Sequence, residues 1–417
     1  MRLGRAMRKH RLVNTYLRLG DNARICLLTE PLWTIPYALY MPFVSVYMSA
    51  LGLSDAMIGA ISSAALISHV VFSLLSGALT DKLGRRLCTF LFDVLAWSVP
   101  ALLWALARDA WWFIAAALLN GALRVSMNSW KLLLVEDEEE SVLIHLFSLL
   151  SIACHLSAFA VLLSYPLVYR FGLVPTVRGM YVFALLCMSA KFVLMYLLGR
   201  ETRVGRQRLT ETRGRPLWAL VKENKGVLWR MLRTPKVMWT AGLVACFTGC
   251  ANLTDTFWPL LATGRMAIPE EGLAFFSAAK SAVMLVCFFW IAPRISAERF
   301  KRPLTLCFQL QILSKLLLIA APAGSSWPLW AAVALDGLSV SLLTPLTESL
   351  SLLCLGTHQR ALSLGLFFSV TLFVTSPLGM IGGLLSNIDR ALPFALVVAL
   401  CLLALWFAGR LKPESAH

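Results

Sequence analysis

Long apolar segments, each bounded by charged residues, glycine or proline, recur along the whole 417-residue chain. A helix needs about 20 mostly apolar residues to cross the hydrocarbon core of a bilayer, and these segments reach that length. The mean hydropathy is +0.73, and only 14% of the residues are charged, against about 25% in soluble domains. The sequence therefore predicts an all-α polytopic membrane protein. The twelve predicted transmembrane helices cover residues 26–49, 56–79, 87–107, 110–133, 142–168, 174–198, 237–262, 272–293, 303–322, 327–353, 361–386 and 391–409.

One long hydrophilic segment, residues 199–236, separates the first six predicted helices from the last six. The division predicts two pseudo-symmetric six-helix bundles, residues 26–198 and 237–410, joined by a central loop. A basic arm, residues 1–25, precedes them, and a short tail, residues 411–417, follows. Two repeats of this kind are typical of carriers that bind their substrate at the interface between the repeats.

Lysine and arginine are distributed unevenly between the two sides of the predicted bundle. We count 28 of them in the loops and termini on the side of the N-terminus and five on the other side. Because short cytoplasmic loops carry an excess of Lys and Arg, both termini are predicted to be cytoplasmic. We expect an integral protein of a bacterial plasma membrane, whose net charge of +16 serves contacts with membrane lipids rather than nucleic acid.

The stretch GALTDKLGRR, residues 77–86, concentrates charge between the second and third predicted helices. Gly77 would let a neighbouring helix approach closely, and Gly84 would allow a tight turn with positive φ. Asp81 is placed to accept hydrogen bonds from Arg85 or Arg86, or to face the N-terminus of a helix. A basic cytoplasmic loop with one turn glycine would explain the cations, but it would not explain Gly77 and Asp81.

GALTDKLGRR resembles the loop signature of the major facilitator superfamily, G-x-L-x-D-[KR]-x-G-[RK]-[RK], at every fixed position. The layout of twelve helices, two halves and a basic central loop is similar as well. The resemblance implies that the motif acts as a gating latch, which holds the second helix against the eleventh while the cytoplasmic side is closed. The eleventh predicted helix contains SPLGMIGG, in which Pro377 and Gly379 suit a bendable, closely packed helix.

The same resemblance implies that the first, fourth, seventh and tenth helices line a central substrate cavity. Each of these helices carries polar residues at helical spacing, and such a stripe must face protein or water inside a membrane. The alternative is that these groups only pair with one another, and Glu30 in particular would then lie at a wet rim. The candidate cavity residues are Glu30, Thr34, Tyr37, Asn120, Arg124, Asn128, Asn252, Asp255 and Asp336.

Two acids and two bases of the second half lie at similar depth, because helices rise about 1.5 Å per residue. They are Asp255, Lys280, Lys315 and Asp336. Such a buried, mutually neutralising network would serve either as the relay for a coupling ion or as a structural clamp on the outer gate.

Two further charged groups have a structural and a functional interpretation. The acidic run EDEEE, residues 136–140, is either a solvated charge run or a partner of Arg85, Arg86 or the central loop. Asp93 and Lys191 lie at matching depth in the third and sixth helices, and we expect them to form a structural pair.

Several chemistries have no signature in the chain. There is no phosphate-binding glycine loop for ATP, no HExxH zinc motif and no nucleophile elbow, and the cysteines show no metal-ligand spacing. We therefore expect neither an enzyme nor a bound cofactor or metal. The fifth helix also lacks the G-x-x-x-G-P-x-x-G-G signature of many drug–proton antiporters.

The sequence thus predicts a monomeric secondary active transporter that moves a small molecule by alternating access. Protons are the expected coupling ion, because carboxylates inside a membrane can load and release them near neutral pH. Efflux of a drug or metabolite is favoured. The alternatives are proton-coupled uptake of a nutrient such as a sugar or organic solute, and a non-transporting sensor or lipid scramblase on the same fold.

Overall fold

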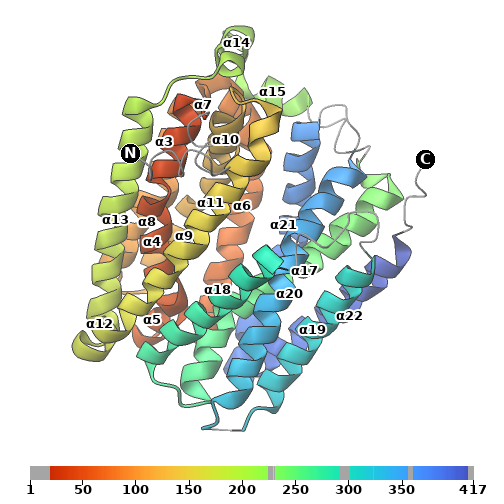
Figure 1. Ribbon diagram of the computed structural model, residues 1–417. Coiled ribbons are helices and arrows are strands. Elements are labelled where there is room, and N and C mark those ends of the chain that lie inside the picture. Colours follow the sequence, from red (N-terminus) through yellow and green to blue (C-terminus); the bar gives the residue numbers. More distant parts are fainter. Residues whose placement is uncertain are drawn as a thin grey trace, which may run out of the picture.

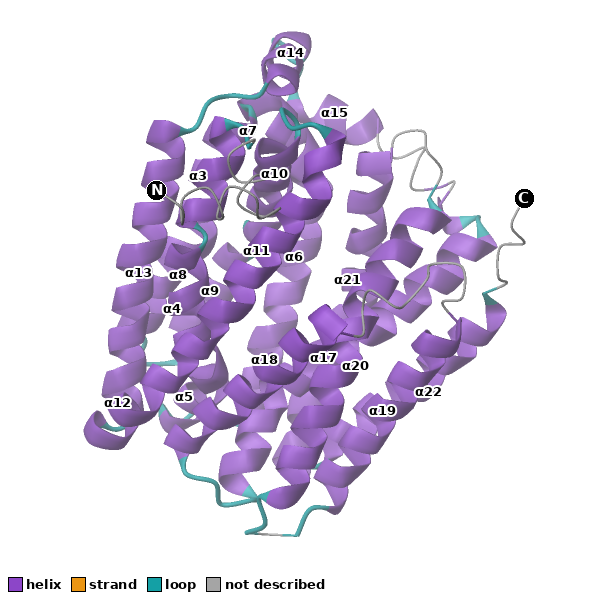
Figure 2. Cartoon of the chain, viewed as in Figure 1, coloured by secondary structure: helices purple, strands orange, loops and turns teal. Residues whose placement is uncertain are grey.

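The computed structural model describes residues 19–223, 229, 231–290, 301–322, 324–355 and 360–411. All regular elements in these ranges are helices (Figures 1 and 2). Figure 1 shows the first half of the chain as one bundle and the second half as another beside it. The fold is that of an all-α polytopic membrane protein built from two pseudo-symmetric bundles.

The first half begins with four consecutive helical pieces that correspond to the first predicted span. Long or paired helices then follow for the second to sixth predicted spans. They are α3 (Asp21–Thr29), α4 (Pro31–Tyr40), η1 (Met41–Phe43), α5 (Val44–Ala50), α6 (Asp55–Leu83), α7 (Arg85–Asp93), η2 (Val94–Ser98), α8 (Val99–Leu106), α9 (Ala110–Asn120), α10 (Leu123–Val135), α11 (Glu140–Ala158), η3 (Phe159–Leu163), α12 (Ser164–Phe171) and α13 (Leu173–Leu198).

The second half follows two short helices of the central segment. These are α14 (Arg203–Glu211) and α15 (Leu217–Glu223). The helices of the second half are α17 (Pro235–Gly264), η4 (Glu270–Gly272), α18 (Leu273–Trp290), α19 (Lys301–Ala320), α20 (Trp327–Cys354), α21 (Arg360–Ile388) and α22 (Leu392–Arg410).

Ten helical stretches of the described chain are long and apolar enough to cross a membrane. They correspond to all predicted spans except the first and the eighth. The first is divided into α3, α4, η1 and α5, and the eighth corresponds to α18. A count of twelve is compatible with this structure.

Proline accounts for the division of the first span. Pro31 begins α4, directly after Glu30, and Pro42 lies in the 3-10 turn between α4 and α5. Proline has no N–H to donate and its ring collides with the preceding turn, so it interrupts the α-helical ladder. Glu30 therefore lies where the first span changes from one helical piece to the next.

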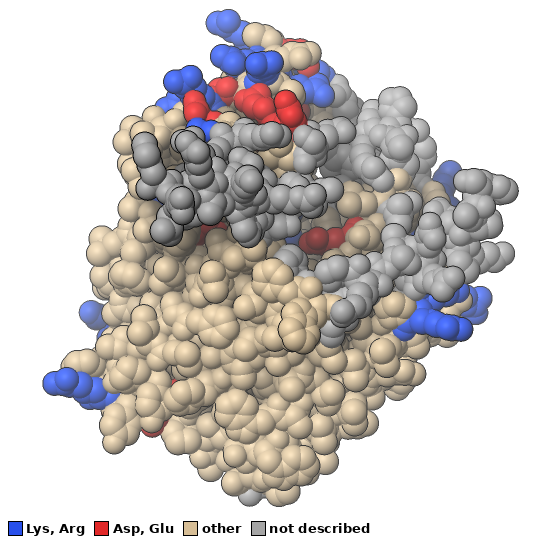
Figure 3. All heavy atoms as spheres, viewed as in Figure 1, with Lys and Arg blue, Asp and Glu red and all other residues tan. Residues whose placement is uncertain are grey.

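The two ends of the bundle differ in what they carry. One end holds α14 and α15, and we call it the basic side; it is uppermost in Figure 1. The opposite end, which we call the far side, brings together the start of α6, the end of α17 and the end of α21. On the face shown in Figure 3, uncharged surface covers most of the lower two thirds of the molecule, and the densest group of charged side chains lies near the basic side.

GALTDKLGRR does not form a loop. Residues 77–83 are the last two turns of α6, Gly84 is the single connecting residue, and Arg85 begins α7. The predicted positive φ at Gly84 is confirmed, with a value of 80°. Residues 80–86 were predicted to connect the second and third helices, and that was wrong for all of them but Gly84, because the flanking Leu, Lys and Arg residues are good helix formers.

Candidate functional site

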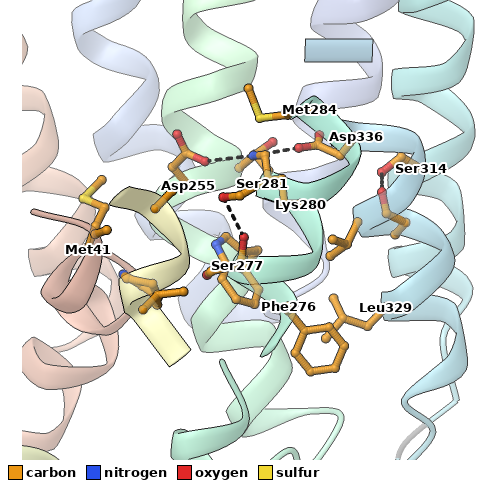
Figure 4. Close-up of a pocket in the computed structure, with 18 of the residues that line it drawn as sticks. Met41, Asp255, Phe276, Ser277, Lys280, Ser281, Met284, Ser314, Leu329 and Asp336 are labelled. Atoms are coloured by element: carbon orange, nitrogen blue, oxygen red, sulfur yellow. Dashed lines mark hydrogen bonds and ion pairs between the residues drawn. The ribbon is translucent and has the colours of Figure 1, made fainter. Parts of the chain in front are cut away.

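A cavity of about 310 Å³ lies between the two halves. Tyr37 and Met41 contribute to it from the first half, and α17, α18, α19 and α20 line it from the second. Figure 4 shows Met41 of the first half at the left of this space and Ser314 of the second half at its right, with Asp255 and Lys280 between them. Its volume falls at the lower end of the range for sites that bind small organic molecules.

Four charged side chains of the second half meet at this cavity. Lys280 lies between two carboxylates, with its Nζ 2.8 Å from Asp336 Oδ2 and 3.5 Å from Asp255 Oδ1 (Figure 4). Lys315 donates to the other oxygen of Asp336. The predicted cluster is therefore present as one connected network, and all four members line the cavity.

Exposure divides the network into a fixed part and an accessible part. The side chains of Lys315 and Asp336 are only 1% and 7% exposed. That of Asp255 is 49% exposed and that of Lys280 is 27% exposed. A buried carboxylate shared by two ammonium groups is held by strong charge-assisted hydrogen bonds. Asp255, with its longer and more hydrated contact, is the member of the network that can move most easily.

The rest of the cavity wall is largely apolar. Aromatic, methionine and leucine side chains alternate with a few hydroxyl groups around the ion pairs. Members that the sequence analysis did not single out are Trp258, Phe276, Ser277, Met284 and Leu329. Ser277 and Lys280 are three residues apart, so they lie on one face of α18. That spacing could have predicted that Ser277 lines the same cavity as Lys280.

The far side holds the two halves together. Ser386 and Arg390, near the end of α21, both donate to Asp55 at the start of α6, at 2.7 and 3.2 Å. Ser63 Oγ accepts a hydrogen bond from the backbone N–H of Met380 at 2.7 Å. We call this set of contacts the far-side seal.

Glycine permits the close approach within this seal. A Cβ on Gly59 would collide with the carbonyl oxygen of Gly379, and one on Gly383 would lie 2.6 Å from the carbonyl oxygen of Asp55. Small residues at such positions let two helix backbones pack directly against each other.

The profile of the Major Facilitator Superfamily matches residues 34–323, which is more than half of the chain. The chain belongs to the major facilitator superfamily. No curated protein sequence matches it.

The solved structures that resemble this chain include three transporters. A structure of the nucleoside transporter NupG (D323A mutant) superposes with a TM-score of 0.73 at 15% identity, covering 94% of this chain and 100% of that one. The human organic anion transporter MFSD10 (TETRAN) gives 0.61 at 15% identity, with 94% and 99% coverage. An auto-inhibited POT family peptide transporter gives 0.72 at 12% identity, with 94% and 98% coverage. At these identities the likeness shows the fold.

The superfamily motif is held by its own half and by the central segment. Arg85, with only 4% of its side chain exposed, contacts Asp81 at 3.1 Å and Glu136 at 3.0 Å. Glu136 also accepts a hydrogen bond from the Thr202 hydroxyl. The acidic run 136–140 is therefore not simply solvated, because its first residue pairs with the motif.

Glu201 closes the N-terminus of α7. Its carboxylate accepts hydrogen bonds from the backbone N–H groups of Arg85 and Arg86, at 2.9 and 3.0 Å. These N–H groups have no partner inside the helix, and the helix dipole favours a negative charge beside them. The Arg86 side chain donates to the carbonyl oxygen of Tyr196 at 2.7 Å.

Glu138 ties the start of the described chain to the same region. Its carboxylate accepts a hydrogen bond from the Gly20 N–H at 2.8 Å. Partial burial raises the pKa of Glu138 above its ordinary value, and the Gly20 hydrogen bond opposes that rise.

SPLGMIGG does not contact GALTDKLGRR in this structure. Gly379 and Gly383 pack against Gly59, near the far-side end of α6, whereas Gly77 lies near the basic-side end. A Cβ on Gly77 would meet no heavy atom within 4 Å. The latch is predicted for a closed cytoplasmic side. In this structure α6 and α21 approach most closely at the far side, so the latch stays a prediction.

The polar stripe of the fourth span lies against its neighbours and not along the cavity. Asn120 donates to the Ala96 carbonyl oxygen, and Asn128 donates to the Thr80 hydroxyl. Arg124 lies between them on α10, and its Nε is buried without a hydrogen-bond partner among the described residues. None of Asn120, Arg124 and Asn128 is among the residues that line the cavity.

Of the remaining predicted cavity residues, Tyr37 lines the cavity, whereas Glu30, Thr34 and Asn252 do not. The Thr34 hydroxyl donates to the Glu30 carbonyl oxygen within the helix. Asn252 accepts a hydrogen bond from Ser62 at 3.1 Å and so joins α17 to α6.

Lys191 pairs with Glu30. Its Nζ lies 2.6 Å from Glu30 Oε2, and both side chains are nearly buried. The rings of Trp33 and Trp130 lie 5.8 and 5.5 Å from the same ammonium group, within the range of cation–π attraction. The expected pair of Lys191 with Asp93 is therefore not the contact formed.

Proposed function

We propose that the protein is a secondary active transporter that moves a small, mainly apolar molecule by alternating access of the cavity between the halves. The observation that carries this proposal is the cavity itself, which is lined from both halves and contains a partly exposed ion-pair network. Alternating access by rocking of one bundle against the other requires two joined halves with a binding site between them.

We propose proton coupling, with Asp255 as the first candidate carrier. A carboxylate that is half exposed in a membrane cavity can exchange protons with water, whereas Asp336 is clamped by two lysines. The basic side faces the cytoplasm in this proposal, because it carries most of the Lys and Arg residues. The protein is expected to act as a monomer.

Efflux is the direction that we propose. The cavity is lined by aromatic, methionine and leucine side chains, with no asparagine or glutamine among the described lining residues. A sugar site would be expected to offer more hydrogen-bonding side chains, so the lining supports a less polar cargo.

The test is transport by purified protein in liposomes with an imposed pH gradient. A panel of labelled drugs, metabolites and sugars would be measured in both directions, with internal pH followed by an entrapped dye. Asp255→Asn is expected to abolish gradient-driven accumulation. Asp109→Asn is the matched control, because this exposed residue caps α9 away from the cavity and asparagine caps helices equally well.

Three outcomes would contradict the proposal. Uptake of a sugar or organic solute would reverse the direction. Flux that does not depend on the pH gradient would contradict proton coupling. No flux of any compound, with movement of lipid between leaflets instead, would favour the scramblase alternative.

A further inference from the structure

The four charges of the cavity network are balanced only when Asp255 is counted. Lys280 and Lys315 share the single carboxylate of Asp336, so this buried part carries one excess positive charge. Asp255 supplies the compensating negative charge, through a contact of 3.5 Å with Lys280. Excess charge inside a membrane protein is costly, and the excess here faces the cavity.

Asp255 is also the most easily replaced member of the network. Half of its side chain is exposed, whereas the Asp336 side chain is 7% exposed. If Asp255 turned toward water, Lys280 would keep its bond of 2.8 Å to Asp336. The ammonium group would then hold donor capacity that no other described residue at the cavity fills.

A negatively charged ligand and a positively charged one have different consequences here. An anion on Lys280 would take the place of Asp255 and keep the network neutral. A cation on Asp255 would draw that carboxylate away from Lys280 and leave the buried excess positive charge uncompensated. The arrangement therefore favours an anion.

A second polar group lines the same cavity. Thr254 precedes Asp255 on α17 and lines the same cavity. Its side chain is 7% exposed, and its hydroxyl has no hydrogen-bond partner among the described residues. A buried hydroxyl without a partner is uncommon in proteins and calls for an explanation. A hydrogen-bonding ligand in the cavity would provide one.

We infer that the transported molecule is an organic anion, whose carboxylate or other acidic group binds Lys280 in place of Asp255 while its apolar body lies against Trp258, Phe276 and Met284. The inference rests on the proposed transport function and adds the class of the substrate. Lys280 is the residue that selects for charge, and Asp255 is the internal competitor of the substrate.

Three probes that share one ring system and differ in charge test this inference. They are 2-naphthoate, the neutral 2-naphthamide and the cationic 2-naphthylmethylammonium. Binding to the purified full-length protein would be measured by thermal shift and by isothermal titration calorimetry. We expect naphthoate to bind about tenfold or more tightly than the other two, the factor for one charge-assisted hydrogen bond.

Two substitutions separate the roles of the network. Lys280→Met is expected to remove the preference for naphthoate, and Lys280→Arg is expected to restore it, since Arg keeps the charge. Asp255→Asn leaves the contact between Lys280 and Asp336 in place and removes the competitor. It is therefore expected to bind naphthoate several-fold more tightly than the unaltered protein, which a merely structural role of Asp255 would not produce.

The alternative outcomes are distinct. Tighter binding of the naphthylmethylammonium ion, equal binding of all three probes, weaker naphthoate binding by Asp255→Asn, or no binding of any probe would overturn the inference. In liposomes, gradient-driven flux of a cation would contradict the assignment of an anionic substrate but would still support the proposed transport function. Absence of flux for the whole substrate panel would instead remove the proposed function.

Discussion

Helix α6 makes contacts of different kinds at its two ends. At the far side it touches the other half, through Asp55, Gly59 and Ser63. At the basic side its last turn contacts its own half and the central segment, through Asp81 and Lys82. In the proposed alternating access, the first end belongs to an interface that would separate, and the second end is held within the first half and the central segment. The superfamily motif lies at the second end.

The largest expected effect on transport follows from filling the glycine contact of the seal. Gly59→Leu places a side chain where the α21 backbone lies, and overpacking costs about 1–3 kcal/mol. We expect flux in liposomes to fall by roughly tenfold, since about 1.4 kcal/mol corresponds to that factor. Gly77→Ala, on the same helix, is the control, because its added methyl group meets open space. If Gly77→Ala stops transport instead, the motif glycine forms its close contact in the opposite conformation.

A large effect of a different kind is expected at the basic side. Arg85→Gln removes the partner of Glu136 in a nearly buried ion pair. Leaving one member of such a pair alone costs about 3–5 kcal/mol. We expect a lower midpoint of thermal unfolding in detergent. Arg86→Gln is the comparison, and a larger loss there than at Arg85 would show that the pair with Glu136 is not what stabilises this end.

The ion pair of the seal should have a moderate effect. Arg390→Gln removes the contact with Asp55, in which the arginine side chain is 32% exposed. Partly exposed pairs contribute about 1 kcal/mol or less, so we expect a several-fold change in flux at most. The exchanged pair Asp55→Arg with Arg390→Asp would recover part of the loss. Failure of the exchanged pair to do better than either single substitution would argue against a specific contact.

The smallest effect on stability is expected at Asp81. A third of its side chain is exposed, so Asp81→Asn should cost below about 1 kcal/mol of folding free energy. Transport should nevertheless decrease while the protein still reaches the membrane, if the motif engages α21 in the opposite conformation. Unaltered flux would confine Asp81 to local pairing with Arg85.

The parts predicted from sequence are those that depend on composition and on distance along a helix. Apolar length located the membrane helices, and depth counting brought Asp255, Lys280, Lys315 and Asp336 to one level, where the structure joins them. Depth does not fix the direction in which a side chain points around its helix. Lys191 therefore pairs with Glu30 rather than Asp93, although all three were recognised as buried charges.

The stripe of Asn120, Arg124 and Asn128 shows a second reason. Polar groups inside a membrane must find partners, but a hydroxyl or carbonyl on a neighbouring helix serves as well as a cavity. The contact between Asp55 and Arg390 was not predicted, since these residues lie at the ends of helices and 335 positions apart. No local pattern links residues so distant in the chain.

The contacts of the central segment with the first half also indicate where the polypeptide can be divided into two chains. Residues 199–223 are fastened to the first half through Glu201, Thr202 and Thr212, and both α14 and α15 lie against α6. This stretch is therefore structurally part of the first bundle, and the boundary with the second bundle lies after Glu223. If the protein is produced as two separate chains, a break between Glu223 and Pro235 should leave each piece with its own contacts. A break before Arg200 would strip the first bundle of the cap on α7.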